Sequence, residues 1–189
     1  MKRIRTIGLF AAAVLFANAA GAQGTMSKEK TVTVGGAPMY PSKNIVENAV
    51  NSKDHTTLVA AVKAAGLVET LEGPGPFTVF APTNEAFDML PKGTVETLLK
   101  PENKAMLTKI LTYHVVAGKL DTKALAEKIK AGNGTAELQT VSGDKLWVMM
   151  KGPKFVIKDE KGGMATITIK NVYQSNGVIQ VIDHVVMPK

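Results

Sequence analysis

The sequence predicts an α+β protein in which helices come first and antiparallel strands follow. Apolar residues recur at helical spacing from about residue 42 to residue 131, which indicates amphipathic helices packed on a core. From Thr135 onward the apolar period becomes two, and glycine-containing turns separate the segments, as is typical of hairpin-connected strands. Helices and strands that are segregated along one chain favour a single packed core over alternating βαβ units.

Residues 1–22 have the features of a secretory signal peptide. Three basic residues among the first five precede an apolar run over residues 7–17, and small residues occupy positions 20–22, where cleavage is expected. A membrane anchor needs about 20 uninterrupted apolar residues, and this run is shorter. We therefore expect cleavage after Ala22 and export, with a soluble mature chain in the periplasm, at the cell surface or in the medium.

Composition indicates one domain that is stabilised by packing alone. The chain contains no cysteine, which excludes a disulfide framework and a thiol nucleophile. Its net charge is +7, and removing the three basic residues of the signal peptide leaves 20 Lys and Arg against 16 Asp and Glu, or +4. These charges are spread singly, and aromatic residues are few. The clustered basic and aromatic surface that binds nucleic acid is therefore missing.

Residues 23–41 are predicted to form a flexible N-terminal arm, because they are rich in Gly, Thr, Lys and Pro and have little apolar periodicity. The short "TVTV" within them could add one edge strand, which could also pair with another copy. We nevertheless expect a monomer. The single domain then spans residues 42–189.

The first two helices are predicted to follow Ser42 and Asp54, since both residue types cap helix N-termini. The second helix is expected to end at Gly66, where a left-handed residue is favoured. His55 falls in the first turn of that helix, and we expect it to be exposed.

A short buried strand, "FTVFAP", is followed by Thr83, which can cap the next helix. Asn84 lies at this joint, and we expect its amide to hydrogen-bond to backbone groups of the turn. A ligand-binding amide in a cleft is the alternative.

A longer helix follows Pro101 and leads into "LTYHVVAGKL". Tyr113 and His114 are adjacent there, and they could handle protons, form half of a metal site, contact a partner or lie in the core. His114 follows Ile110 by four residues and Leu111 by three, so a continuing helical turn would point it into the core.

One more helix is predicted from the cap Asp121 to Gly132. Strands are then predicted around five apolar centres, Leu138, Trp147, Val156, Ile167 and Ile182. The last of these strands is apolar on both faces, which indicates burial on both sides. We expect Asp183 to accept backbone hydrogen bonds at the edge of the core, because a buried carboxylate without partners is costly.

The motifs of common catalytic sites are missing. The sequence has no Gly-x-Ser-x-Gly elbow and no His-Glu-x-x-His pair, and its "GPGP" lacks the lysine of a phosphate-binding loop. The three histidines, His55, His114 and His184, are far apart along the chain. We expect no enzymatic activity, no cofactor and no metal.

Three separated stretches together resemble a fasciclin domain: "GPFTVFAPTNEAFDMLP", "LTYHVVAGKL" and "NGVIQVIDHVVMPK". They occur in family order over residues 41–189. The resemblance implies a β-sandwich or wedge of about seven strands with a packed helical subdomain. One departure is Gln180, where many members have histidine, so a binding role of that ring is not carried over. The candidate adhesion or structural residues are Thr83, Asn84, Tyr113, His114 and Asp183.

The resemblance implies adhesion or recognition rather than catalysis. Animal members are extracellular adhesion proteins, in some of which the Tyr-His segment is implicated in integrin binding, and single-domain bacterial members are similar to secreted antigens. We predict an exported, non-enzymatic module that binds an extracellular or envelope protein or glycan. For Tyr113 and His114 themselves a structural role is preferred, with His114 hydrogen-bonded in the core.

The alternative function is a binder of a small apolar ligand, or a hydrolase, that uses a cleft between the helices and the sheet. The segment around Trp147, Met149 and Met150 favours it, because Met and Trp suit adaptable apolar surfaces. Core packing competes with this interpretation, since Leu146 and Val148 alternate with Trp147 and Met149 and one set must face inward.

Overall fold

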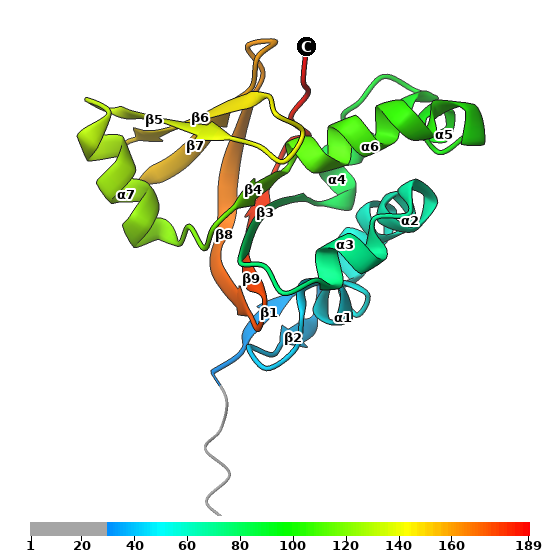
Figure 1. Ribbon diagram of the computed structural model, residues 1–189, viewed down its shortest axis with the longest axis horizontal. Helices are drawn as coiled ribbons and strands as arrows, with labels where there is room; N and C mark the ends of the chain where they lie inside the picture. Colours follow the sequence, from blue (N-terminus) through cyan, green and yellow to red (C-terminus); the bar gives the residue numbers. More distant parts are fainter. Residues whose placement is uncertain (1–29) are drawn as a thin grey trace, which may run out of the picture.

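A computed structural model describes residues 30–189 of the chain (Figure 1). The predicted signal peptide, residues 1–22, lies outside the described residues, as does the beginning of the predicted arm.

Seven strands form one mixed sheet in the order β4-β3-β9-β8-β7-β6-β5. The sheet curves until β4 meets the end of β5, where Val116 bridges Thr140 and the Val141 N–H donates to the Val115 carbonyl at 2.8 Å. It is therefore nearly closed, and the predicted α+β wedge of about seven strands is confirmed. The strands are β3 (Phe77–Pro82), β4 (Val115–Ala117), β5 (Thr135–Gln139), β6 (Lys145–Lys151), β7 (Lys154–Lys158), β8 (Met164–Gln174) and β9 (Gly177–Ile182).

One strand pair corrects the expectation of an antiparallel sheet. β3 and β9 run parallel, with Phe77 opposite Gly177 and Pro82 opposite Ile182. Parallel neighbours need a long crossover, and here it contains helices and strands β4 to β8. All six residues of β9 are buried, which confirms the prediction that this strand is covered on both faces.

The helices gather on two sides of the sheet. Figure 1 shows α1 to α6 on one side and α7 beside β5 and β6 on the other. Two 3₁₀ turns, Lys53–His55 and Pro101–Asn103, precede α2 and α6. The helices are α1 (Ile45–Ala49), α2 (Thr56–Ala65), α3 (Val68–Glu72), α4 (Asn84–Asp88), α5 (Thr94–Leu98), α6 (Lys104–Tyr113) and α7 (Thr122–Ala131).

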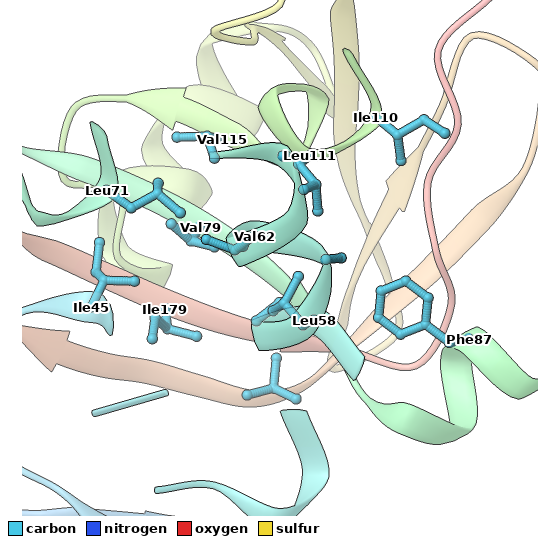
Figure 2. Packing of buried hydrophobic residues seen from close by; sticks show 14 of the residues in the cluster. Ile45, Leu58, Val62, Leu71, Val79, Phe87, Ile110, Leu111, Val115 and Ile179 are labelled. Carbon is cyan, nitrogen blue, oxygen red and sulfur yellow. The ribbon is translucent and has the colours of Figure 1, made fainter. Parts of the chain in front are cut away.

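The sheet separates two hydrophobic cores. The first lies under α1 to α6, where Leu58, Val62 and Leu111 pack toward Val79 and Ile179 of the sheet (Figure 2). The second lies inside the curved sheet beneath α7. Because side chains alternate across a strand, β3 contributes Val79 and Ala81 to the first core and Phe80 to the second.

The predicted flexible arm is wrong over residues 32–39. β1 (Val32–Val34) and β2 (Ala37–Met39) form a hairpin, and the buried Val34 and Met39 belong to the first core. Gly35 and Gly36 both have positive φ, 57° and 76°, which is the backbone of a tight hairpin turn. The "TVTV" strand therefore pairs within the chain.

Two predicted helix caps are also wrong. Asn44, not Ser42, caps α1, and it forms a capping box with Glu47 in which each side chain accepts from the other residue's N–H. Asp54 lies in the 3₁₀ turn before α2 and does not cap that helix. The caps at Thr83 and Asp121 and the left-handed Gly66 are confirmed.

Candidate functional site

Tyr113 and His114 lie at the end of α6, and both side chains are inside the protein. Tyr113 is 0 % exposed and His114 is 2 % exposed. The Tyr113 hydroxyl donates to the Lys145 carbonyl at 2.7 Å and accepts from the Glu160 N–H at 3.1 Å. Tyr113 therefore joins the end of α6 to the start of β6 and to the loop after β7.

His114 connects the same helix to the C-terminal segment. Its Nδ1 lies 2.8 Å from the Ile110 carbonyl oxygen and its Nε2 lies 3.2 Å from the Val186 backbone nitrogen. The carbonyl can only accept and the amide can only donate, so the neutral ring carries its proton on Nδ1. The hydrogen-bonded buried ring agrees with the structural role preferred from the sequence.

Neither side chain is poised for proton transfer at neutral pH. Burial lowers the pKa of His114 to about 4, and the bond to Ile110 and the charge of Asp159 offset only part of this effect. Burial likewise raises the pKa of Tyr113 to about 12. The imidazole thus stays neutral with both nitrogens bonded, and the phenol keeps its proton.

Thr83 and Asn84 hold the beginning of α4. The Thr83 hydroxyl accepts from the Ala86 N–H at 3.3 Å, as a helix cap does. The Asn84 amide oxygen accepts from the Thr57 N–H at 3.1 Å, and its nitrogen donates to the Lys53 carbonyl at 2.8 Å. Asn84 thus bonds to backbone groups as predicted, but they belong to α2 and to the 3₁₀ turn before it rather than to its own turn.

Replacing Asn84 by alanine should lower the free energy of unfolding by about 1 to 2 kcal/mol, because the Thr57 N–H loses a partly buried hydrogen bond and the Lys53 carbonyl loses an exposed one. Urea denaturation measures this change. Glu85→Ala is the matched control, since Glu85 is an exposed neighbour on the same helix. Equal stability of the two variants would show that the Asn84 bonds do not connect α4 to α2.

Asp183 lies just beyond β9, which ends at Ile182. Its Oδ1 accepts from the Thr166 N–H at 2.6 Å and lies 2.8 Å from Nδ1 of the exposed His184. Burial raises the pKa of Asp183, but the hydrogen bonds from His184 and Thr166 outweigh burial and bring it below its ordinary value. The predicted backbone bond at the edge of the core is therefore present.

Gln180, which stands where many family members have histidine, has a structural role in this chain. Its side chain is completely buried, its nitrogen donates to the Leu120 carbonyl at 3.1 Å, and its oxygen accepts from the Asn171 N–H at 3.0 Å. Asn171 has a φ of 56° and lies where the register of β8 shifts. The amide of Gln180 thus supports the bulge that bends β8, which is a structural task.

The sequence-predicted residues do not converge on one site. Within residues 30–189, no three His, Asp or Glu side chains lie close enough together to hold a metal ion. Over the same residues, no helix has the length and apolar character to cross a bilayer.

His55 is the site residue that the sequence placed wrongly, because it is buried with 3 % of its surface exposed. The 3₁₀ turn before α2 rotates the ring inward, where Nδ1 lies 2.9 Å from the Ser52 hydroxyl. Its Nε2 has no hydrogen-bond partner. Burial lowers the pKa of His55, which keeps the ring neutral.

His55 also lines an apolar cavity of about 70 Å³ between the helices and the sheet. Its walls come from helices α1, α2, α3 and α6 and from strands β1, β2, β3, β4, β8 and β9. Figure 2 shows several of the wall residues, including Leu58, Val62, Leu71 and Val79. Helical periodicity predicts which residues face the core, but it does not predict where their packing leaves space.

The segment around Trp147 lies away from this cavity. Leu146 and Val148 are completely buried in the second core, so the alternate residues Trp147 and Met149 face outward and are partly exposed. Cross-strand pairing places Lys158 beside Trp147, and Met164 beside Lys158. Together these residues form an outer sheet face, defined here by Trp147, Met149, Lys158 and Met164.

Comparison with known proteins agrees with this architecture. The chain is 48% identical over 160 residues to protein sll1483 of Synechocystis, an alignment that covers 85% of this chain and 82% of that one. It is 37% identical over 145 residues to the immunogenic protein MPB70 of Mycobacterium bovis, covering 74% and 66% of the two chains.

A solved pair of domains from the insect cell adhesion molecule fasciclin I has a similar fold. The TM-score is 0.54 at 24% identity, and the match covers 69% of this chain and 43% of that one. The model of the fasciclin domain matches residues 53–188, which include β3 and β9, the Tyr113 and His114 pair and Asn84. The chain belongs to the fasciclin domain family.

Proposed function

We propose that this protein is an exported, non-enzymatic adhesion module that contacts an extracellular or envelope protein. The observation that carries the proposal is membership of the fasciclin domain family, in which a solved relative comes from a cell adhesion molecule. The non-enzymatic part of the proposal is supported by three polar side chains, Tyr113, His114 and Asn84. Their hydrogen bonds go to backbone groups and hold the fold together.

Because the Tyr113 and His114 side chains are buried, we propose that the partner binds at another surface. A partner reaches neither ring while α6 and the C-terminal segment stay packed. Hot spots of protein interfaces are enriched in tryptophan, and interface cores are enriched in methionine and aromatic residues. The outer sheet face carries the single tryptophan of the chain, together with Met149 and the 44 % exposed Met164.

Charges within this face and beside it favour a protein partner. Glu137 lies opposite Trp147 on β5 and forms a 2.7 Å ion pair with Lys145, while Lys158 and Lys145 supply positive charge. Hydrogen bonds from Lys145, and also from Trp147, lower the pKa of Glu137. Protein interfaces combine aromatic and methionine side chains with polar and charged groups, as this face does.

The test is saturable binding of the processed chain to extracellular matrix, envelope polysaccharide and host-cell preparations, measured by biolayer interferometry. We expect saturable binding to a protein component, and we expect Trp147→Ala to weaken it about tenfold, as hot-spot truncation does. Met106→Ala is the matched control, because Met106 is 59 % exposed on α6.

Absence of saturable binding to all three preparations contradicts the adhesion module itself. Saturable binding that Trp147→Ala and Met106→Ala weaken equally contradicts only the assigned face. Circular dichroism of each variant confirms that the sheet is intact before the affinities are compared.

A further inference from the structure

We propose that the partner of the outer sheet face is an acidic, extended protein segment that carries an apolar side chain between its carboxylates. This inference rests on the proposed adhesion function and names the chemistry of the partner. Three observations carry it: the lysines that the sheet gathers around Trp147, the scarcity of acidic side chains beside them, and the apolar side chains that lie between them.

Strand pairing brings together lysines that are spread singly along the sequence. Side chains alternate across a strand, so Lys145 and Lys151 lie on the face of β6 that carries Trp147, away from the second core. On β7, Lys154 lies opposite Lys151, and Lys158 lies opposite Trp147. All four lysines are exposed, and together they form a basic surface over β6 and β7.

This basic surface has few acidic neighbours. The outward-facing residues of β5, β6 and β7 include one acid, Glu137, so the four lysines leave a net charge of +3. Glu137 is already paired with Lys145 at 2.7 Å. The other three lysines form no ion pair with any of residues 30–189. Their charges are therefore free to attract an anionic partner.

Two of these lysines repel each other. Like charges that lie directly opposite on neighbouring strands destabilise a sheet, and Lys151 and Lys154 are such a pair. The Lys151 ammonium lies 3.1 Å from the sulfur of Met164, a weak acceptor and not a countercharge. Lysines often protect the edge of a sheet from pairing with another chain, but β6 and β7 are interior strands of this sheet. Carboxylates of a partner would relieve the repulsion.

The spacing of the lysines favours a peptide as the anion. Lys154 and Lys158 are four residues apart on one face of β7, or roughly 13 Å. Val156 lies between them, and it pairs with Met149. An extended peptide likewise presents every second side chain on one face. Acids four residues apart can therefore reach both lysines while the side chain midway between them packs on Met149. Phosphates and acidic sugars supply the charge without this apolar side chain.

The probe is the peptide acetyl-Glu-Glu-Thr-Leu-Thr-Glu-Glu-amide, which is titrated into the processed chain while backbone ¹⁵N–¹H signals are recorded by NMR. We expect saturable shifts that are concentrated on β6 and β7. The Debye length falls from about 30 Å at about 0.01 M salt to about 8 Å at about 0.15 M, so the affinity should fall as salt is raised over this range.

Two matched peptides separate charge from apolar contact. A peptide with glutamine in place of every glutamate should bind about tenfold more weakly, the factor expected of about three exposed ion pairs. A peptide with serine in place of leucine keeps all the charges, and it should also bind more weakly because it cannot pack on Met149.

Variants of the chain test the same contacts from the other side. The double variant Lys154→Gln and Lys158→Gln should bind the acidic peptide about fivefold more weakly. Lys92→Gln with Lys100→Gln is the matched control, because it removes the same charge at exposed lysines outside the sheet. Lys154→Gln alone should leave the stability toward urea unchanged or slightly higher, since it removes the repelling pair.

Saturable shifts on β6 and β7 that depend on Lys154 and Lys158 support the proposal. Absence of shifts with the acidic peptide overturns it, and so does equal affinity for the glutamine peptide. Equal affinity for the serine peptide, or tighter binding of inorganic tripolyphosphate, overturns the assignment to a peptide with a central apolar side chain. A loss of stability in Lys154→Gln would show that this lysine serves the fold instead.

The matrix, polysaccharide and host-cell preparations judge the adhesion function separately. Saturable binding to a preparation that the double lysine variant leaves unchanged contradicts only the acidic partner. Binding of the acidic peptide without binding to any preparation contradicts only the adhesion function, because the chemistry of the face would then stand without the proposed role.

Discussion

Replacing His114 by alanine should lower the free energy of unfolding by about 2 to 4 kcal/mol. The ring is 2 % exposed, and it bonds to the Ile110 carbonyl on one side and the Val186 N–H on the other. Alanine leaves both groups buried without this partner and leaves a space where the ring had been. Urea denaturation at pH 7.5 measures the loss.

The conservative variant His114→Gln shows which part of this loss comes from the hydrogen bonds. Glutamine has a donor and an acceptor, so it should recover part of the stability that alanine loses. His184→Ala is the matched control, because His184 is exposed and its pairing with Asp183 is a surface interaction worth less than about 1 kcal/mol. If His114→Ala unfolded with wild-type stability, the ring would not be connecting α6 to the C-terminal segment.

Local features of the fold could be predicted from the sequence because they depend on neighbours along the chain. The caps at Thr83 and Asp121 follow from residue types that accept from the first helical N–H groups. The burial of His114 follows from its spacing after Ile110 and Leu111 on the same helix face. Strands β5 to β9 follow from period-two apolar runs between turns.

Features that depend on distant segments could not be predicted in this way. The parallel pairing of β3 with β9 joins residues about 100 positions apart, such as Phe77 and Gly177, and strand periodicity does not identify a partner. The cavity is another example, since its walls come from elements spread along the chain from β1 to β9 and its volume depends on how closely they pack.

Two local features, the hairpin over residues 32–39 and the 3₁₀ turn at His55, differ from what the sequence predicts. The arm around "TVTVGGAPM" is polar and glycine-rich, yet its alternating valines and paired glycines are hairpin features, and Val34 and Met39 gain burial in the core. Helical spacing predicts that His55 lies in the first turn of a regular α-helix and is exposed. In the structure it ends a 3₁₀ turn, and its ring is buried. A difference of one turn type therefore separates an exposed histidine from a buried one.

Acid should destabilise the protein well above the pH at which its carboxylates titrate. Burial lowers the pKa of His114 from 6.5 to about 4, so the unfolded chain binds this proton more tightly than the folded chain does. The stability from the neutral ring is complete above about pH 6.5 and is lost as the pH falls toward 4. The shift corresponds to roughly 3 kcal/mol over that window, and His55, whose pKa is also lowered by burial, adds a loss of the same sign.

The pH window separates the histidines from the carboxylates. Asp121 and Asp183 have pKa values below their ordinary 3.8, so their contribution to stability is lost only as the pH falls further. In urea titrations at a series of pH values from 7.5 to 4.5, the wild-type chain should therefore lose stability steadily below about pH 6.5. His114→Gln should show a shallower pH dependence of stability, and His184→Ala should show that of the wild type.

Parallel curves for wild type and His114→Gln would mean that the folded chain accepts a proton at His114 as readily as the unfolded chain. The two hydrogen bonds of the buried neutral ring do not allow this. Protonation at Nε2 would place two donors face to face, because the Val186 N–H already points at that nitrogen, so the neutral ring and the packing of the C-terminal segment must be lost together.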